Sequence, residues 1–171
     1  LNMAEVRLEN MYAGGLFDHI GYGSCRYSTD CYYLLPHFEK MLYDNALLIL
    51  TYCKAYELTG RPFYLEVAQK TASYVLNEMT APNGGFYSAQ DADSDGEEGK
   101  YYVFTPEEII GLLGQVDGTA FCERFGITKA GNFEGKSIPN LFRAKDLTDQ
   151  RFDPFLPALR EYRRGRTHLH T

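Results

Sequence analysis

Two amphipathic patterns joined by a short turn constrain this chain more than any other feature of its sequence. The first runs from Glu39 to Thr59 and the second from Pro62 to about Met79, each with apolar residues at steps of three and four. The stripes comprise Leu42, Ala46, Ile49, Cys53 and Tyr56, and then Leu65, Ala68, Ala72, Val75 and Met79. Gly60 is suited to end one helix and Pro62 to begin the next. The sequence therefore predicts an antiparallel helical hairpin.

Weaker patterns predict further elements on both sides of this hairpin. Met3 and Val6 share one face of a helix over residues 2–13. Thr105 and Glu108 form a capping box that begins another helix, which ends near Gly114. The remaining expected elements are helices over residues 119–125 and 157–164, and strands over 86–88 and 101–104 that pair as a small β-hairpin.

The composition argues against several classes of protein. The chain has 171 residues, which is enough for one ordinary domain with a real core. Its 17 Lys and Arg against 23 Asp and Glu give a net charge of −6, which argues against a nucleic-acid partner. The longest apolar stretch, around Ala46–Leu50, is too short to span a membrane, and no signal segment opens the chain. We therefore expect a cytoplasmic protein without a membrane association.

The first polar stretch that could carry chemistry lies in and after a glycine-rich loop over residues 15–24. Asp18 and His19 lie within this loop, and Arg26 and Tyr27 follow it. Glycine permits a close approach of the backbone to a ligand, and these polar side chains can bind hydroxyl or carboxylate groups. A turn with solvated charges is the alternative.

The second polar stretch surrounds the start of the 39–59 helix. It contains His37, Glu39, Lys40, Tyr43 and Asp44. A histidine within a few residues of a carboxylate is suited to proton transfer, because its pKa is the nearest to neutral of any side chain. The alternative is that Glu39 and Asp44 only stabilise the helix N-terminus electrostatically.

The third polar stretch is an acidic loop over residues 91–102. Asp91, Asp93 and Asp95 match the opening of a calcium-binding loop, but Tyr102 stands where the bidentate glutamate should be. The cysteines form no C-x-x-C motif. We therefore expect no metal or cofactor, and Asp91 and Asp93 are predicted to be carboxylates at a pocket mouth. An exposed acidic turn is the alternative.

Five stretches together resemble the YyaL/spermatogenesis-associated-protein family: 14–19, 26–30, 36–45, 84–94 and 131–136. The strings H-F-E-K-M-L-Y-D and D-A-D-S are the most specific. The resemblance implies an all-α fold in which antiparallel helical hairpins over 1–171 form part of an (α/α)6 toroid, with a small β-hairpin insertion near 85–104. In this family a thioredoxin-like domain precedes the toroid. We expect this sequence to lack that domain, and a full toroid needs more residues, so we also expect a fragment or a truncated gene product.

The family's toroid is similar to those of sugar epimerases and six-hairpin glycosidases, which implies a carbohydrate-active or sugar-binding domain. The expected catalytic residues are His37, Glu39, Asp44, Asp91 and Asp93. The expected substrate-binding residues are Asp18, His19, Arg26, Tyr27, Lys40, Tyr43 and Tyr101. Epimerisation would use His37 and Glu39, or His19, whereas hydrolysis would use Asp91 or Asp93 with Glu39 or Asp44. The alternative function is a non-catalytic scaffold or protein-interaction module that partners a redox domain.

Two expectations concern the arrangement of the molecule. The polar residues are predicted to converge at one wet mouth of the helical array, where at least one carboxylate has a raised pKa. An incomplete toroid would leave apolar helix faces uncovered, so we also expect self-association.

Overall fold

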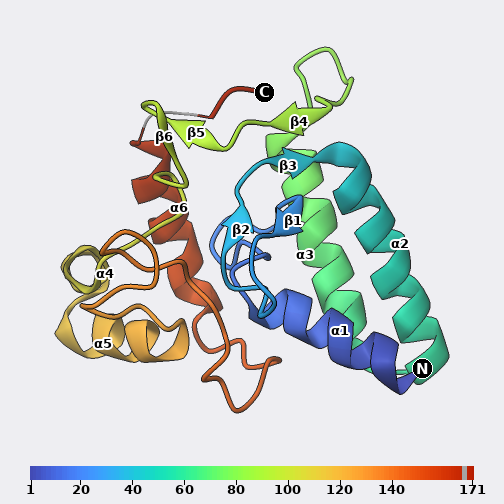
Figure 1. Ribbon diagram of the computed structural model, residues 1–171, viewed down its shortest axis with the longest axis horizontal. Helices are drawn as coiled ribbons and strands as arrows, with labels where there is room; N and C mark the ends of the chain where they lie inside the picture. The colour runs from blue at the N-terminus through green and yellow to red at the C-terminus, as the bar shows by residue number, and fades with distance from the viewer. Residues whose placement is uncertain (167–168) are drawn as a thin grey trace.

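The computed structural model describes residues 1–166 and 169–171, which fold mainly into helices (Figure 1). These residues contain six α-helices: α1 (Asn2–Ala13), α2 (Leu42–Thr59), α3 (Pro62–Glu78), α4 (Pro106–Leu113), α5 (Gln115–Arg124) and α6 (Leu156–Arg164). A short 3-10 turn, Asp153–Phe155, precedes α6. Helices α2 and α3 pack along each other as one pair, and α4 and α5 form a second pair. The mostly helical fold with paired helices is confirmed, and the toroid stays a prediction.

The turn between α2 and α3 forms as its sequence predicts. Gly60 adopts a left-handed conformation with φ of 69°, and its N–H donates to the carbonyl of Tyr56. Pro62 occupies the first turn of α3. Between these two residues, Arg61 forms ion pairs with Glu5 and Glu9 of α1, at 3.2 and 2.6 Å. These contacts hold α1 across the connected ends of α2 and α3 (Figure 1).

The start of α2 and the buried face of this helix differ from the prediction. Helix α2 begins at Leu42 rather than at Glu39, because the backbone over Lys40–Met41 forms strand β3 and pairs with β4 (Ala89–Gln90). The predicted stripe of α2 is also wrong in part, since Ala46 and Tyr56 are exposed. The residues that α2 buries fully are Asn45, Tyr52 and Ala55.

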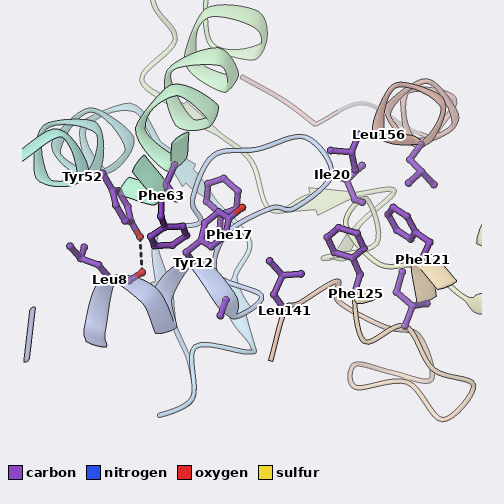
Figure 2. Packing of buried hydrophobic residues seen from close by; sticks show 14 of the residues in the cluster. Leu8, Tyr12, Phe17, Ile20, Tyr52, Phe63, Phe121, Phe125, Leu141 and Leu156 are labelled. Atoms are coloured by element: carbon purple, nitrogen blue, oxygen red, sulfur yellow. Dashed lines mark hydrogen bonds between the residues drawn. The ribbon is translucent and has the colours of Figure 1, made fainter. Parts of the chain in front are cut away.

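The packing of α1 explains this shift of the buried face. Tyr52 donates a hydrogen bond of 2.9 Å from its hydroxyl to the carbonyl of Leu8 (Figure 2). Helix α1 therefore covers the face of α2 that carries Tyr52. In α1 itself, Leu8 and Tyr12 are buried, while Met3 and Val6, which the sequence places on one face, are exposed.

The residues that the structure describes also form three two-stranded antiparallel sheets, whose strands lie in the segments α1–α2 and α3–α4. Strand β1 (Tyr27–Ser28) pairs with β2 (Pro36–His37), β3 with β4, and β5 (Asp93–Ser94) with β6 (Glu97–Glu98). The β5–β6 hairpin lies inside the predicted 85–104 region, but the predicted pairing of 86–88 with 101–104 is wrong. Phe86 instead bridges to Thr80, and Phe104 to Ser137.

The tight turn of the β5–β6 hairpin has a local cause. Asp95 and Gly96 both have positive φ, at 56° and 75°. Two such residues between short strands are typical of a type I′ turn, whose twist matches that of an antiparallel hairpin. The acidic loop is thus a structured hairpin.

The C-terminal elements follow the prediction with shifted bounds. The capping box is confirmed: Thr105 accepts from the backbone N–H of Glu108, and the Glu108 side chain accepts from the N–H of Thr105. Helix α5 begins at Gln115, four residues before the predicted start, and α6 begins at Leu156. Among the described residues, no helix combines the length and the apolarity needed to cross a membrane.

One large hydrophobic cluster joins the two helix pairs. Figure 2 shows Tyr12 and Phe63 on one side of this core, and Phe121 and Phe125 on the other. The ring centroids of Tyr12 and Phe63 lie 5.3 Å apart, and those of Phe121 and Phe125 lie 4.4 Å apart. Ile20 of the glycine-rich loop belongs to the same cluster. The loop therefore runs through the core, which fixes the positions of its polar neighbours.

Candidate functional site

Asp18 is the centre of a buried ion network. Its carboxylate accepts two hydrogen bonds of 2.9 Å from the guanidinium of Arg163 in α6. Lys40 of β3 donates a further bond of 2.9 Å to Oδ2 of Asp18. The exposed fractions of these side chains are 5% for Asp18, 6% for Arg163 and 1% for Lys40. The network is therefore shielded from water and is not at a wet mouth.

The backbone around Asp18 is shaped for this network. Oδ1 accepts the N–H groups of Ile20 and Gly21, each at 3.0 Å. A Cβ atom at Gly21 would lie 1.8 Å from Nη2 of Arg163, so any side chain there would push the guanidinium away from its place beside Asp18. Burial alone would raise the pKa of Asp18, but Arg163 and Lys40 outweigh it and lower the pKa well below its usual range. Asp18 therefore stays ionised.

His19 lies in the aromatic core rather than at the surface. Its ring centroid is 5.2 Å from that of Tyr12 and 5.4 Å from that of Phe17. The Nε2 atom lies 3.1 Å from the carbonyl oxygen of Gly14. Burial lowers the pKa of His19 to about 4, so the imidazole is neutral at neutral pH.

A second group of polar residues lies at the surface, and we call it the His37 cluster. It comprises Arg26, Tyr27, His37, Glu39, Tyr43, Asp44 and Glu98. In its centre, Nδ1 of His37 lies 2.7 Å from Oε1 of Glu98, and Nε2 lies 3.9 Å from Oε2 of Glu39. The three side chains are 31%, 46% and 28% exposed. One imidazole is thus bracketed by two carboxylates within reach of solvent.

The β1–β2 pairing places an aromatic ring on this imidazole. Tyr27 and His37 are register partners, and their rings stack with centroids 5.1 Å apart. Arg26 adds an ion pair of 3.0 Å with Glu39, and its backbone N–H donates to the Glu39 carbonyl. The hydrogen bond that the Arg26 guanidinium donates to Glu39 is the largest cause of the raised pKa of Arg26, and Tyr43 contributes as well.

Asp44 is the carboxylate of the cluster whose pKa is raised. Burial is the main cause, Glu39 adds to it, and Arg26 opposes it. Its Oδ2 atom is shielded from solvent and has no hydrogen-bond partner among the residues that the structure describes. Asp44 lies in the first turn of α2, but no side chain caps that helix by a hydrogen bond. The expected raised carboxylate pKa is therefore found at Asp44.

The remaining predicted residues occupy different environments. Asp91 accepts hydrogen bonds from the N–H groups of Ala92 and Asp93, which stabilises the local turn. Asp93 is exposed and is the register partner of Glu98 in the β5–β6 hairpin. Tyr101 is buried, with the guanidinium carbon of Arg163 4.8 Å from its ring centroid. Tyr101 therefore belongs to the surroundings of the buried network.

The structure thus divides the predicted site. It brings six predicted residues together at the surface: Arg26, Tyr27, His37, Glu39, Tyr43 and Asp44. Through Glu98, the β5–β6 hairpin brings Asp93 to the same region. Asp18, Lys40 and Tyr101 belong to the buried network, and His19 to the core. Among residues 1–166 and 169–171, no group of three or more His, Cys, Asp or Glu side chains is arranged to hold a metal.

Comparison with known proteins places the chain in a family. Human (Homo sapiens) spermatogenesis-associated protein 20 is 38% identical over 183 aligned positions, which cover 92% of this chain and 23% of the human protein. The mouse (Mus musculus) protein of the same name is 40% identical over 153 positions, 81% of this chain and 19% of the mouse protein. This chain belongs to the spermatogenesis-associated protein 20 family.

The match to this family is partial. An uncharacterised protein of Caenorhabditis elegans is 35% identical over 158 positions, which cover 81% of this chain and 21% of that protein. The chain spans about a fifth of the length of these curated relatives. No protein-family model matches the chain. The predicted family resemblance is confirmed for the segment that the chain represents.

Two residues of this family segment were missed by sequence reasoning. The sequence does carry a signal for the position of Glu98: Asp95-Gly96 is a strong turn signal, which folds the acidic loop into a hairpin and brings Glu98 opposite Asp93. Arg163 lies 145 residues from Asp18 in the sequence, and nothing in its local pattern indicates that it pairs with a loop so distant. The His37 cluster and the buried network meet at adjacent residues of one backbone segment, Glu39 and Lys40.

Proposed function

We propose that the His37 cluster is part of a carbohydrate-binding site in which His37 exchanges a proton with the ligand. The observation that supports this most is the imidazole held between two carboxylates, at 2.7 and 3.9 Å, beneath a stacked tyrosine ring. An imidazole next to a carboxylate is suited to accept a proton as a general base and to return it as a general acid.

The surrounding side chains are of the kinds that bind sugars. Tyr27 and Tyr43 are each half exposed, and an aromatic face at the surface offers apolar area for the C–H face of a sugar ring. Arg26 and Glu39 supply a donor and an acceptor for hydroxyl groups. Sugar binding needs an aromatic face and hydrogen-bonding groups together, and the His37 cluster combines the two at one place on the surface.

The resemblance to toroids of sugar epimerases and glycosidases suggests two reaction types for the larger relatives. An epimerase or isomerase would use His37 with Glu39 to remove and return a proton. A glycosidase would use two carboxylates, with Glu39 or Asp44 on one side of the bond and Asp91 or Asp93 on the other. Both reactions would take place in a six-hairpin toroid to which the two helix pairs belong. We favour proton transfer, because His37 and Glu39 already share one site.

The second candidate function is a protein-interaction module, and one feature of α2 favours it. Tyr43, Leu47, Leu50 and Leu58 are exposed along this helix at steps typical of one face. An apolar face of this kind is suited to binding another protein surface. A module of this type would bind through α2 and would not respond to sugars.

A sugar titration followed by NMR separates the two functions. The imidazole signals of His37 are recorded while neutral monosaccharides and disaccharides are added. We expect these signals to shift on binding, and the shift to disappear in Tyr27→Ala. The matched control is Tyr32→Ala, which removes an exposed tyrosine outside the cluster. If no sugar shifts the His37 signals, or if Tyr32→Ala abolishes the sugar-induced shift as completely as Tyr27→Ala does, the carbohydrate proposal is wrong.

A further inference from the structure

We infer that a groove along the exposed side of α1 binds the exposed face of α2 from a second copy of this chain. This contact is independent of the proposed carbohydrate site, because it involves other residues and another kind of partner. Three features support it: two adjoining cavities along α1, the apolar row on α2, and the charges of the two surfaces.

The groove, which we call the α1 groove, consists of two adjoining cavities that share Asn10 and Tyr33. Their volumes are about 460 and 430 Å³. The first is lined by Met3, Val6 and Arg7 of α1, and the second by Cys31, Tyr32 and Phe142. Met3 and Val6 are 89% and 56% exposed. The α1 groove is therefore an open and largely apolar surface, of the kind that binds another helix.

The loop that forms the second wall of the α1 groove is held in one conformation. Asp30 accepts hydrogen bonds from the N–H groups of Tyr32 and Leu34, at 2.7 and 3.2 Å. Tyr33 has a positive φ of 63°, which is uncommon for a residue other than glycine. Its carbonyl accepts from the N–H of Leu16 at 3.1 Å. A wall that is already ordered lowers the entropic cost of binding a partner.

Helix α2 has a face that fits a groove of this length. Leu47, Leu50 and Leu58 are 60%, 66% and 60% exposed, and their spacing places them on one side of the helix. At 1.5 Å per residue this row is about 16 Å long, and the α1 wall from Asn2 to Asn10 is about 12 Å long. The cavity beyond Asn10 extends the groove further. Each copy of the chain therefore carries both the groove and a helix that fills it.

The charges of the two surfaces favour a second copy over a basic protein. Arg7 is the one charged residue among those that line the α1 groove, and it has no ion-pair partner among the residues that the structure describes. The whole chain has a net charge of −6. On α2, Lys54 is paired with Glu57 at 2.7 Å, so this pair adds no net positive charge to the exposed face. An unpaired cation in the groove favours an acidic partner.

Two variants with complementary defects test this contact. Val6→Glu places a carboxylate in the α1 groove, and Leu50→Glu places one on the exposed face of α2. Each variant alone should weaken self-association at least about tenfold in sedimentation experiments, because the contact would bury a charge without a partner. An equimolar mixture should associate again, since the Leu50→Glu copy keeps an intact groove and the Val6→Glu copy keeps an intact α2.

The matched control is Ala4→Glu, which adds the same charge at an exposed position of α1 outside the groove lining. This variant should associate like the wild-type protein. If Val6→Glu also associates like the wild-type protein, or if the mixture stays monomeric, the inference is wrong. A wild-type protein that is monomeric at micromolar concentration would overturn it as well.

Cross-linking tests the contact while the α1 groove keeps its native residues. Cys31 is exposed and lines the groove, and a short bismaleimide should join it to the introduced thiol of Leu50→Cys in a second copy. Mass spectrometry of the joined peptides identifies the link. Val116→Cys, at an exposed position of α5, is the control and should not be joined to Cys31. Links that join only two α2 helices to each other would show that α2 binds α2, which would refute the inference.

Discussion

At the scale of single residues, burial separates two groups of charges that look alike in the sequence. Asp18 and Lys40 are almost fully buried and paired, whereas Glu39 remains partly exposed one position away. The pairing of Lys40 with Asp18 takes place in a region of low dielectric, where an unpaired charge is expensive. In the first group each charge therefore depends on its partner to stay buried, whereas the second group is available to a ligand.

Removing one partner of the buried network should destabilise the protein strongly. Arg163→Met leaves the Asp18 carboxylate with Lys40 as its remaining cation, and we expect a loss of about 3 kcal/mol in the free energy of unfolding. The matched control is Arg164→Met in the same helix. Arg164 is mostly exposed, and its ion pairs with Glu78 and Glu161 are long, at 3.8 and 3.5 Å. Its loss should cost less than about 1 kcal/mol.

Urea unfolding followed by circular dichroism measures both variants. Equal losses for Arg163→Met and Arg164→Met would show that the buried network adds no more stability than a surface pair.

His19 should make the stability of the protein depend on pH below neutrality. Its pKa is about 4 in the folded protein and near 6.5 when unfolded, because burial disfavours the imidazolium. Between these values the unfolded chain binds a proton that the folded protein does not. Stability is therefore full above about pH 6.5 and falls as the pH drops toward 4, by about 3 kcal/mol in total.

The measurement is the urea midpoint of the wild-type protein and of His19→Gln across this range. We expect the variant to have a smaller slope between pH 6.5 and 4, whatever its stability at neutral pH. An unchanged slope would mean that folding does not lower the pKa of His19.

At the scale of elements, the packing of α4 against α5 determines which glycine of this helix pair can be replaced by a larger residue. Gly111 lies in α4, and a Cβ atom added there would meet nothing within 4 Å. Gly118 lies in α5, where a Cβ atom would stand 2.7 Å from Cα of Ile110 in α4. Close packing of the two helices therefore depends on the absence of a side chain at Gly118, but not at Gly111.

Alanine at these two positions should have opposite effects on stability. Gly111→Ala should stabilise by up to about 1 kcal/mol, because alanine has the higher helix propensity. Gly118→Ala should destabilise by about 1–3 kcal/mol, because the backbones of α4 and α5 must separate. Thermal and urea unfolding compare the two. If both variants gain stability, the packing of α4 against α5 is looser than the structure has it.

At the scale of the whole molecule, a large apolar core joins the helix pairs while the outer face of α2 stays uncovered. Residues from the glycine-rich loop and from both helix pairs belong to the same cluster (Figure 2). In contrast, Leu47 and Leu50 of α2 are more than half exposed. The outer face of α2 is therefore a row of apolar side chains that the fold leaves exposed.

We expect this face to cause self-association. Light scattering after size exclusion at micromolar concentration should give a dimer or a larger species, and the double variant Leu47→Glu/Leu50→Glu should give a monomer. The control is Val116→Glu, which adds the same charge at an exposed apolar residue of α5. A monomeric wild-type protein would refute the expectation, and so would a Val116→Glu variant that dissociates equally.

The sequence by itself determines the features that depend on neighbouring residues. The Gly60 and Pro62 turn, the capping box at Thr105 and the end of α4 all arise from backbone preferences and hydrogen bonds within a few residues. The family segment is also readable from its motifs. These interactions are local, so their energy is nearly independent of the rest of the chain.

The tertiary structure alone decides which polar residues are buried and which remain at the surface. Lys40 lies in a strand and not in the predicted helix, because β3 pairs with β4. Its ammonium group can be buried because Asp18 and the carbonyl of Tyr22 accept hydrogen bonds from it. Arg163 reaches the same carboxylate from α6, and Glu98 reaches His37 from the acidic hairpin. The cost of burying a charge depends on the partner that meets it, and those partners lie far away in the sequence.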